Sequence, residues 1–201
     1  MFSAELALPA FLVALLAYLA GSVSAAIIVC RLMKLDDPRS TGSGNPGATN
    51  VLRLGGKVPA AITLVGDAAK GFLPVLLTAL VISHPPTIAL AALAAFIGHI
   101  YPVFFKFEGG KGVATGLGAM LGVSFSVGAL ALLTWLAVSL TFKRSSLAAL
   151  VTFALVPVYF MFEAQPPYAI VFVIIGVILF YKHRDNIKRL MDGSEPVIGK
   201  K

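Results

Sequence analysis

The stretch LALPAFLVALLAYLAGSVSAAIIVC, residues 6–30, holds 25 consecutive residues without a charged side chain. A helix needs about 20 predominantly apolar residues to cross the hydrocarbon core of a bilayer. The stretch exceeds the ~7–15 apolar residues of a secretory signal peptide, and no Lys or Arg precedes it. We therefore expect a retained first transmembrane helix over residues 5–30.

The rest of the chain is equally apolar. Of its 201 residues, 58% are hydrophobic and 12% are charged, and the mean hydropathy is +0.92. Soluble domains carry about 25% charged residues. Apolar runs predict further spans over 58–82, 87–105, 146–163 and 166–182. No soluble domain fits between them, so we expect an all-α polytopic integral membrane protein with a single membrane-embedded domain over 1–201.

One uncharged stretch, 114–141, has 28 residues, too many for one comfortable span and few for two. Lys111 and Lys143 flank it, and an even number of crossings must separate them if both lie on the same side. Two short helices that turn near Val123–Ser126 fit best and bring the total to seven transmembrane helices. A re-entrant pair, which leaves five spans, preserves the same parity.

The positive charges predict the orientation. Lys and Arg gather in segments 31–57, 106–111, 143–144 and 182–201, whereas the turns near 84–86 and 163–167 contain none. Loops rich in Lys and Arg lie on the cytoplasmic side, so we expect the N-terminus outside and the C-terminus in the cytoplasm. The net charge of +7 then describes a basic cytoplasmic face, which attracts anionic lipids and could also collect an anionic substrate.

The first polar motif is TGSGNPGATN, residues 41–50, flanked by Arg39 and Arg53. Glycines allow backbone N–H groups to converge on an anion, and arginines neutralise its charge. The motif contains G-x-G-x-x-G, but a dinucleotide site needs that pattern after a strand in a βαβ unit. We interpret the motif as an anion-binding loop; the alternative is a flexible polar connector.

The second motif, GHIYPVFFKFEGGKGVAT, covers residues 98–115. Its GGKG end resembles the end of a P-loop, but Phe105 replaces the first glycine and Gly112 replaces the Ser or Thr that binds Mg²⁺. Lys111, set among glycines, remains suited to a phosphate oxygen. A lone membrane histidine such as His99 is more often a hydrogen-bonded core residue than a chemical group.

The third motif, YKHRDNIKRL, covers residues 181–190 and follows the last span directly. Positive-inside anchoring explains its four Lys and Arg residues. It does not explain His183 and Asn186, which share one helical face and can form hydrogen bonds with a polyol phosphate.

Asp67 and Lys70 lie three residues apart within the predicted span 58–82. Ionisable groups at membrane depth are costly and are functional candidates. The alternatives are an internal ion pair, or a helix that begins near Gly66 with Asp67 as its N-cap.

Several chemistries have no signature in the chain. Zinc-ligand spacing, H-E-x-x-H, G-x-S-x-G and the H-x-x-x-x-D acyltransferase pattern are all absent, and the single cysteine, Cys30, excludes an internal disulfide. We expect no metal and no cofactor, and no general base is evident. A small transporter of organic phosphates would also fit, although transporters bind near the midplane and often contain internal repeats, which this chain lacks.

Together the motifs R-x-x-G-S-G-N-x-G-A-T-N-x-x-R, G-H-x-x-P-x-F-x-x-F-x-G-G-K-G-V-A-T and H-R-x-N-I-x-R-L resemble the bacterial acyl-phosphate-dependent glycerol-3-phosphate acyltransferases, the PlsY family. The resemblance implies transfer of a fatty acyl group from acyl phosphate to the sn-1 hydroxyl of glycerol 3-phosphate. The products would be lysophosphatidic acid and phosphate, in the first step of bacterial phospholipid synthesis. It also implies seven helices in the bacterial inner membrane, a site facing the cytoplasm, and membrane lipid as a partner.

The resemblance also implies residue roles. Catalysis would rest on Ser43, Arg53 and Lys111. Substrate binding would involve Gly44, Asn45, Thr49, Asn50, His183, Arg184 and Asn186. Asp67, Lys70 and His99 would support the loops. The donor phosphate would accept the hydroxyl proton, in agreement with the missing base. A transient contact with the enzyme that produces acyl phosphate is expected, whereas nucleic acid is not an expected partner.

Overall fold

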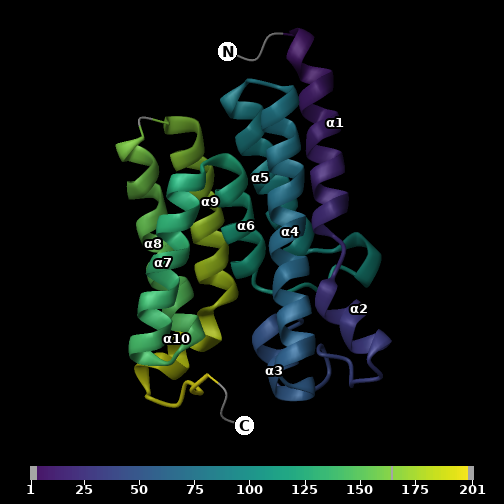
Figure 1. Ribbon diagram of the computed structural model, residues 1–201, viewed down its shortest axis with the longest axis vertical. Coiled ribbons are helices and arrows are strands. Elements are labelled where there is room, and N and C mark those ends of the chain that lie inside the picture. The colour runs from purple at the N-terminus through teal and green to yellow at the C-terminus, as the bar shows by residue number, and fades with distance from the viewer. Residues whose placement is uncertain (1–3, 164, 199–201) are drawn as a thin grey trace.

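The computed structural model describes residues 4–163 and 165–198 and contains helices but no strand within them. Figure 1 shows the long helices running side by side. The apolar helices are α1 (Ala4–Gly21), α4 (Lys57–Val81), α5 (Pro85–Ile100), α6 (Val113–Val123), α7 (Phe125–Phe142), α8 (Ser145–Phe162) and α9 (Pro166–Lys182). The shorter elements are α2 (Ala25–Leu32), α3 (Ala48–Gly55), the 3₁₀ turn η1 (Val103–Phe105) and α10 (Arg184–Met191).

The helices have the length and surface of membrane spans. Five segments among the described residues are long and apolar enough to cross a bilayer, and α9 with α10, bent by 63°, would make a sixth. Helix α6, with 11 residues, is shorter. Large apolar side chains such as Leu8, Leu80 and Phe125 are exposed along the helices, which is the expected surface for a protein solvated by lipid tails. The number of seven crossings stays a prediction.

The first predicted span, residues 5–30, is confirmed as a candidate membrane span over Glu5–Leu32. It is not one continuous helix, however, and in this respect the expectation is wrong. Helix α1 ends at Gly21 and α2 begins at Ala25. The Ser22 hydroxyl donates to the Tyr18 carbonyl at 2.8 Å, and the Ser24 hydroxyl caps α2 by accepting from the Ile27 amide at 3.5 Å. Serine side chains compete with backbone hydrogen bonds and favour such breaks.

The stretch 114–141 forms two helices, as predicted. Helices α6 and α7 meet at Ser124, whose hydroxyl caps α7 by accepting from the Val127 amide at 3.2 Å. The same hydroxyl donates to Glu163 Oε1 at 2.9 Å. This contact places the α6–α7 turn beside the end of α8, which favours two full crossings over a re-entrant pair.

Helix α6 lies against α4 at backbone contact distance. A Cβ added to Gly118 would lie 2.0 Å from the Ala68 carbonyl oxygen, and one added to Gly71 would lie 2.0 Å from that of Thr115. Small residues allow membrane helices to approach this closely. The contact holds the start of α6, and therefore the glycine-rich segment before it, against the middle of α4.

The two ends of the molecule differ in their chemistry. Figure 1 places the N-terminus, the end of α8 and the start of α9 at one end, and α2, α3, α10 and the C-terminus at the opposite end. The basic segments 31–57, 143–144 and 182–198 therefore lie at one end. The fourth basic segment, 106–111, contacts the first and the last of these through Arg39 with Glu108 and through Lys111 with Asn186. Which end faces the cytoplasm stays a prediction.

Candidate active site

The 41–50 loop is shaped by one buried amide, that of Asn50, which is 1% exposed. Its Nδ2 donates to the carbonyl oxygens of Pro38 at 2.9 Å and Thr41 at 3.0 Å, and its Oδ1 accepts from the Ser43 amide at 2.9 Å. Both amide hydrogens are thus used within the loop. Asn50 therefore shapes the loop, while Ser43 is exposed on it.

Gly42 is required at its position for two reasons. Its φ of +67° lies in the left-handed region, and a Cβ there would lie 2.3 Å from Asn50 Oδ1. Gly44 follows with a φ of +69° and is exposed. Asn45 is half-buried, and Thr49 at the start of α3 lies 3.4 Å from the Ser145 hydroxyl of α8. The sequence had not indicated Ser145 as a neighbour of this loop.

The 41–50 loop meets the glycine-rich segment 109–112 at Gly110. A Cβ on Gly110 would lie 2.4 Å from His99 Nε2 and 3.0 Å from the Pro46 carbonyl oxygen. Arg39 makes a second link, with Nη1 3.1 Å from Glu108 Oε2. The first two motifs therefore form one continuous structure, in which Gly110 leaves no room for a side chain.

The second and third motifs meet through Lys111 and Asn186. The Lys111 ammonium donates to Asn186 Oδ1, and Asn186 Nδ2 donates to Glu195 Oε1 at 2.6 Å. Glu195 is 7% exposed and also accepts from the Ser146 hydroxyl at 2.6 Å and from Arg189 Nε at 2.7 Å. Burial raises the pKa of Glu195, but these three hydrogen bonds outweigh it and lower the pKa.

Sequence reasoning missed Glu195 and Ser146. Glu195 lies outside every motif, five residues after the last of them, in a basic tail. Its only signal was a second acidic residue, three positions after Asp192, and such residues near a chain end are usually solvated. The carboxylate instead joins α8, α10 and the C-terminal segment, and it sets the orientation of the Asn186 amide.

His183 is buried at the α9–α10 junction, with Nδ1 2.8 Å from the Leu179 carbonyl oxygen. Only a protonated Nδ1 can donate to a carbonyl, so Nε2 is left as an acceptor in the neutral ring. Burial lowers the pKa of His183 to about 4, although the bond to Leu179 acts in the opposite direction. His183 is therefore neutral at physiological pH.

Lys111 is the most perturbed lysine outside the membrane-spanning helices. Burial, reinforced by the charge of Arg189, lowers its pKa to about 8. The ammonium is thus charged at neutral pH but poorly solvated, and a phosphate or an oxyanion would relieve that cost. Arg53 is half-buried on α3, two residues from its end.

The structure does not bring Arg184 into this cluster. Its guanidinium lies 4.9 Å from the centre of the Tyr181 ring, its Nη1 donates to the Tyr181 carbonyl oxygen at 3.3 Å, and the residue is exposed. The residues predicted to position glycerol 3-phosphate therefore separate into a buried pair, His183 and Asn186, and an outer arginine.

Asp67 and Lys70 form the internal ion pair that was one of the alternatives for them. Asp67 Oδ1 lies 2.7 Å from Lys70 Nζ and 3.7 Å from His99 Nδ1, and all three residues are buried. Lys70 Nζ also donates to the Val23 carbonyl oxygen, 2.8 Å away, in the α1–α2 break. Helix α4 begins at Lys57, so the interpretation of Asp67 as an N-cap is wrong. The cluster connects the broken helix to His99, whose ring contacts Gly110.

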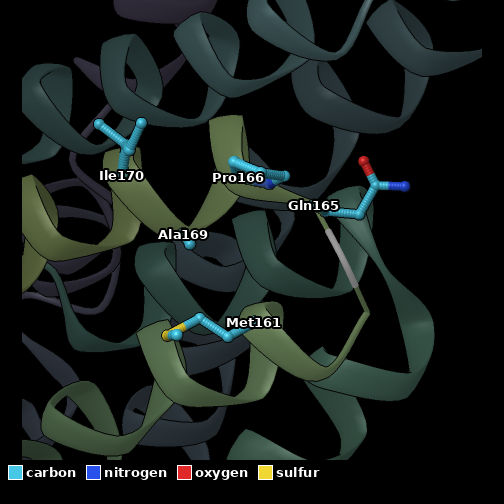
Figure 2. Close-up of a pocket in the computed structure, with 5 residues that line it drawn as sticks. All are labelled: Met161, Gln165, Pro166, Ala169 and Ile170. Carbon is cyan, nitrogen blue, oxygen red and sulfur yellow. The ribbon is translucent and has the colours of Figure 1, made fainter.

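The structure was also searched for a metal site and for hollows away from these motifs. Among the described residues, no group of three or more His, Cys, Asp or Glu residues could hold a metal ion. A hollow of about 310 Å³ between α8 and α9 contains none of the predicted site residues; Figure 2 shows its lining, with the Gln165 side chain pointing away from Met161.

Comparisons with known proteins agree with these motifs. A family model described as glycerol-3-phosphate acyltransferase matches residues 11–193. Glycerol-3-phosphate acyltransferases of Halorhodospira halophila and Methylococcus capsulatus are 53% and 50% identical to the chain over 186 residues, which cover 92% of the chain and 94% of each relative.

A solved structure is similar over nearly the whole fold. It is the crystal structure of PlsY (YgiH), an integral membrane glycerol 3-phosphate acyltransferase, in its glycerol 3-phosphate form. The match has a TM-score of 0.91 at 36% identity and covers 95% of this chain and 96% of that chain. The lysophosphatidic acid form of the same protein matches with a TM-score of 0.88. The chain belongs to the glycerol-3-phosphate acyltransferase family.

Proposed function

We propose that this protein transfers a fatty acyl group from acyl phosphate to the sn-1 hydroxyl of glycerol 3-phosphate, at the cytoplasmic face of the bacterial inner membrane. The acceptor oxygen forms the new ester bond to the acyl carbon, the acyl–phosphate C–O bond breaks, and lysophosphatidic acid and phosphate leave. The observation that carries the proposal is the convergence of three distant motifs on Gly110 and Lys111. The glycerol 3-phosphate and lysophosphatidic acid forms of the solved relative support the acceptor and the product.

The acceptor would be positioned by the buried pair on the α9–α10 side. The free Nε2 of neutral His183 accepts a hydrogen bond from a glycerol hydroxyl, while Asn186 is held by Glu195 at 2.6 Å. Lys111 and Arg189 supply positive charge for the acceptor phosphate. Arg184 lies outside this group and adds long-range attraction at the surface.

The donor phosphate would be held by the 41–50 loop. Ser43 and Gly44 are exposed there, and the start of α3 follows with its unpaired backbone N–H groups. Arg53 from α3 and Lys111 from the glycine-rich segment balance the phosphate charge. Lys111 also stabilises the oxyanion that forms as the acceptor attacks, a role worth ~10²–10³-fold in rate for one donor.

The donor phosphate itself would take the hydroxyl proton. A general base works best with a pKa near the working pH, and His183, with a pKa of about 4, is too weak. Glu195 is occupied by three hydrogen-bond donors. A phosphate group, whose second pKa is about 6, is better matched. Because acyl phosphate is already activated, the protein mainly orients the two substrates.

The decisive experiment supplies glycerol 3-phosphate with palmitoyl phosphate, palmitoyl-CoA or palmitoyl carrier protein in separate reactions of the purified protein in lipid. We expect lysophosphatidic acid with equimolar phosphate from palmitoyl phosphate alone. Product from a thioester alone would overturn the donor and the proton route but leave the acyltransferase activity. No product from any donor, with the protein shown to be folded, would favour transport of organic phosphates.

A further inference from the structure

Lys182, the last residue of α9, lies against an aromatic ring instead of a carboxylate. Its ammonium is 5.5 Å from the centre of the Tyr101 ring, which follows the end of α5. With the residues that the structure describes, it forms neither a hydrogen bond nor an ion pair. A cation–π contact is weaker than a hydrogen-bonded ion pair. The charge of Lys182 is therefore available to a stronger anionic partner.

The Lys182 ammonium lies beside the candidate active site. Lys182 directly precedes His183, the proposed partner of a glycerol hydroxyl. Tyr101 belongs to the second motif, residues 98–115, which also contains Lys111. The charge of Lys182 is close enough to Lys111 to contribute to the lowering of its pKa. Lys182 thus lies among the groups proposed to bind phosphate.

The two substrates of the proposed reaction carry more negative charge than the residues assigned so far can balance. A phosphate linked through one oxygen carries about −1.5 to −2 at neutral pH, so donor and acceptor together bring about −3 to −4. Arg53 and Lys111 supply one positive charge each. The charge of Arg189 is offset by Glu195, whose Oε2 lies 2.7 Å from Arg189 Nε. A further cation is therefore needed when both substrates are bound.

Lys182 is better placed for this role than the other cations of its segment. Arg184 is exposed and lies over the Tyr181 ring, and Lys188 is exposed on α10. Lys182 is half-buried, and a flexible four-carbon stem carries its ammonium. The positive-inside rule explains a lysine at the end of a span, but it does not explain an ammonium that lies against the second motif.

We propose that Lys182 binds the phosphate of glycerol 3-phosphate, and that its ammonium moves from the Tyr101 ring to this phosphate when the acceptor binds. The inference rests on the proposed acyl transfer, to which it adds a cation on the acceptor side. The Tyr101 ring is then a holding position for the charge. Because the cation–π contact is the weaker one, the ammonium leaves it for a phosphate oxygen.

The test compares Lys182→Gln with Lys188→Gln, a matched control that removes the same charge from an exposed position in the same basic segment. Calorimetry in lipid nanodiscs measures the Kd of glycerol 3-phosphate without any donor, and kinetics with palmitoyl phosphate measure kcat and both KM values. We expect Lys182→Gln to raise the Kd and the KM of glycerol 3-phosphate about tenfold, as loss of one charged hydrogen bond does. Its kcat and its KM for palmitoyl phosphate should stay unchanged. Lys188→Gln should keep the wild-type values, because exposed charges contribute little.

Two further variants separate a phosphate ligand from a structural contact. Tyr101→Leu removes the ring that holds the ammonium, so the Kd of glycerol 3-phosphate should stay the same or fall. Lys182→Arg keeps the positive charge and should bind within about threefold of the wild type. An equal rise of Kd in Tyr101→Leu and Lys182→Gln, or no recovery in Lys182→Arg, would mean that the contact is structural and would overturn the inference.

The remaining outcomes also overturn the inference. Equal Kd values in the Lys182→Gln and Lys188→Gln variants would leave only a general attraction of anions to the basic face. A higher KM for palmitoyl phosphate with an unchanged Kd for glycerol 3-phosphate would assign Lys182 to the donor. Because the calorimetry uses no donor, it tests Lys182 whichever donor the wild type uses. Failure of the proposed function would appear in the wild-type donor assays, and failure of this inference in the binding of glycerol 3-phosphate.

Discussion

At the scale of single residues, the Lys111 ammonium carries most of the candidate chemistry, and it loses its charge at a lower pH than an ordinary lysine. Burial and Arg189 lower its pKa to about 8, so the charge is present below that pH and lost above it. We predict that kcat/KM falls about tenfold per pH unit above pH 8, because the deprotonated amine cannot stabilise phosphate or oxyanion charge. The rate profile between pH 6 and 10 measures this.

The matched variant is Lys111→Arg, since arginine stays charged throughout this range. The activity of Lys111→Arg will be lower than that of the wild type, but its kcat/KM should no longer fall above pH 8. If kcat/KM of Lys111→Arg still falls above pH 8 as in the wild type, the group that loses its proton there is not Lys111.

Glu195 is the residue through which the C-terminal segment acts on the site. We predict that Glu195→Gln raises the KM for glycerol 3-phosphate about tenfold, because an amide cannot accept from Ser146, Asn186 and Arg189 together. Loss of such buried hydrogen bonds also costs about 1–3 kcal/mol of stability. Saturation kinetics and thermal unfolding in lipid measure the two effects.

Glu163→Gln is the control, since Glu163 also accepts hydrogen bonds from two serines, Ser124 and Ser126, but beside the α6–α7 turn. It should leave that KM unchanged. If the Glu195 and Glu163 variants have equal KM values for glycerol 3-phosphate, Glu195 does not position Asn186 for substrate binding.

At the scale of elements, the site depends on two loops that touch without intervening side chains. We predict that Gly110→Ala lowers kcat/KM by ~10²-fold. The added Cβ would lie 2.4 Å from His99 Nε2 and 3.0 Å from the Pro46 carbonyl oxygen, so the two loops would have to move apart. A displacement of catalytic groups by about 1 Å is enough for a loss of that size. Gly176→Ala on α9, whose Cβ would meet only an ordinary 3.4 Å contact, is the control. Wild-type activity in Gly110→Ala would show that the loops move apart freely.

The break between α1 and α2 shows that some element boundaries depend on contacts between distant residues. The local pattern of apolar residues gives no information on these contacts. Apolar runs placed four of the predicted spans within a few residues of α4, α5, α8 and α9. The interruption between α1 and α2 depends on Ser22, Ser24 and the bond from Lys70 to the Val23 carbonyl oxygen. Lys70 is 47 residues away in the chain, so no local pattern could have indicated it.

At the scale of the whole molecule, the arrangement of α6 and α7 decides how many times the chain crosses the bilayer. We predict seven crossings. In a Cys30→Ser background, Ser83→Cys and Phe125→Cys should react with an impermeant thiol reagent only from outside, and Lys143→Cys only from the cytoplasmic side. The contact of Ser124 with Glu163 is the physical reason, since it ties the α6–α7 turn to the end of α8.

Labelling in right-side-out and inverted vesicles distinguishes the two arrangements. Phe125→Cys labelled only from the cytoplasmic side would establish the re-entrant pair and five spans. The exposed Met191, on α10, gives a matched cytoplasmic control as Met191→Cys.

The sequence by itself determined the class of the molecule, the positions of most helices, the three motifs and the family they indicate. These properties are local, because hydropathy over about 20 residues decides insertion into a bilayer and a motif lies within a short segment. Only the tertiary structure decided that Asn50 shapes its loop, that Glu195 orients Asn186 and that Arg184 lies apart. Each of these depends on which distant backbone or side-chain atoms come within hydrogen-bonding or contact distance after the helices pack, and packing is a property of the whole chain.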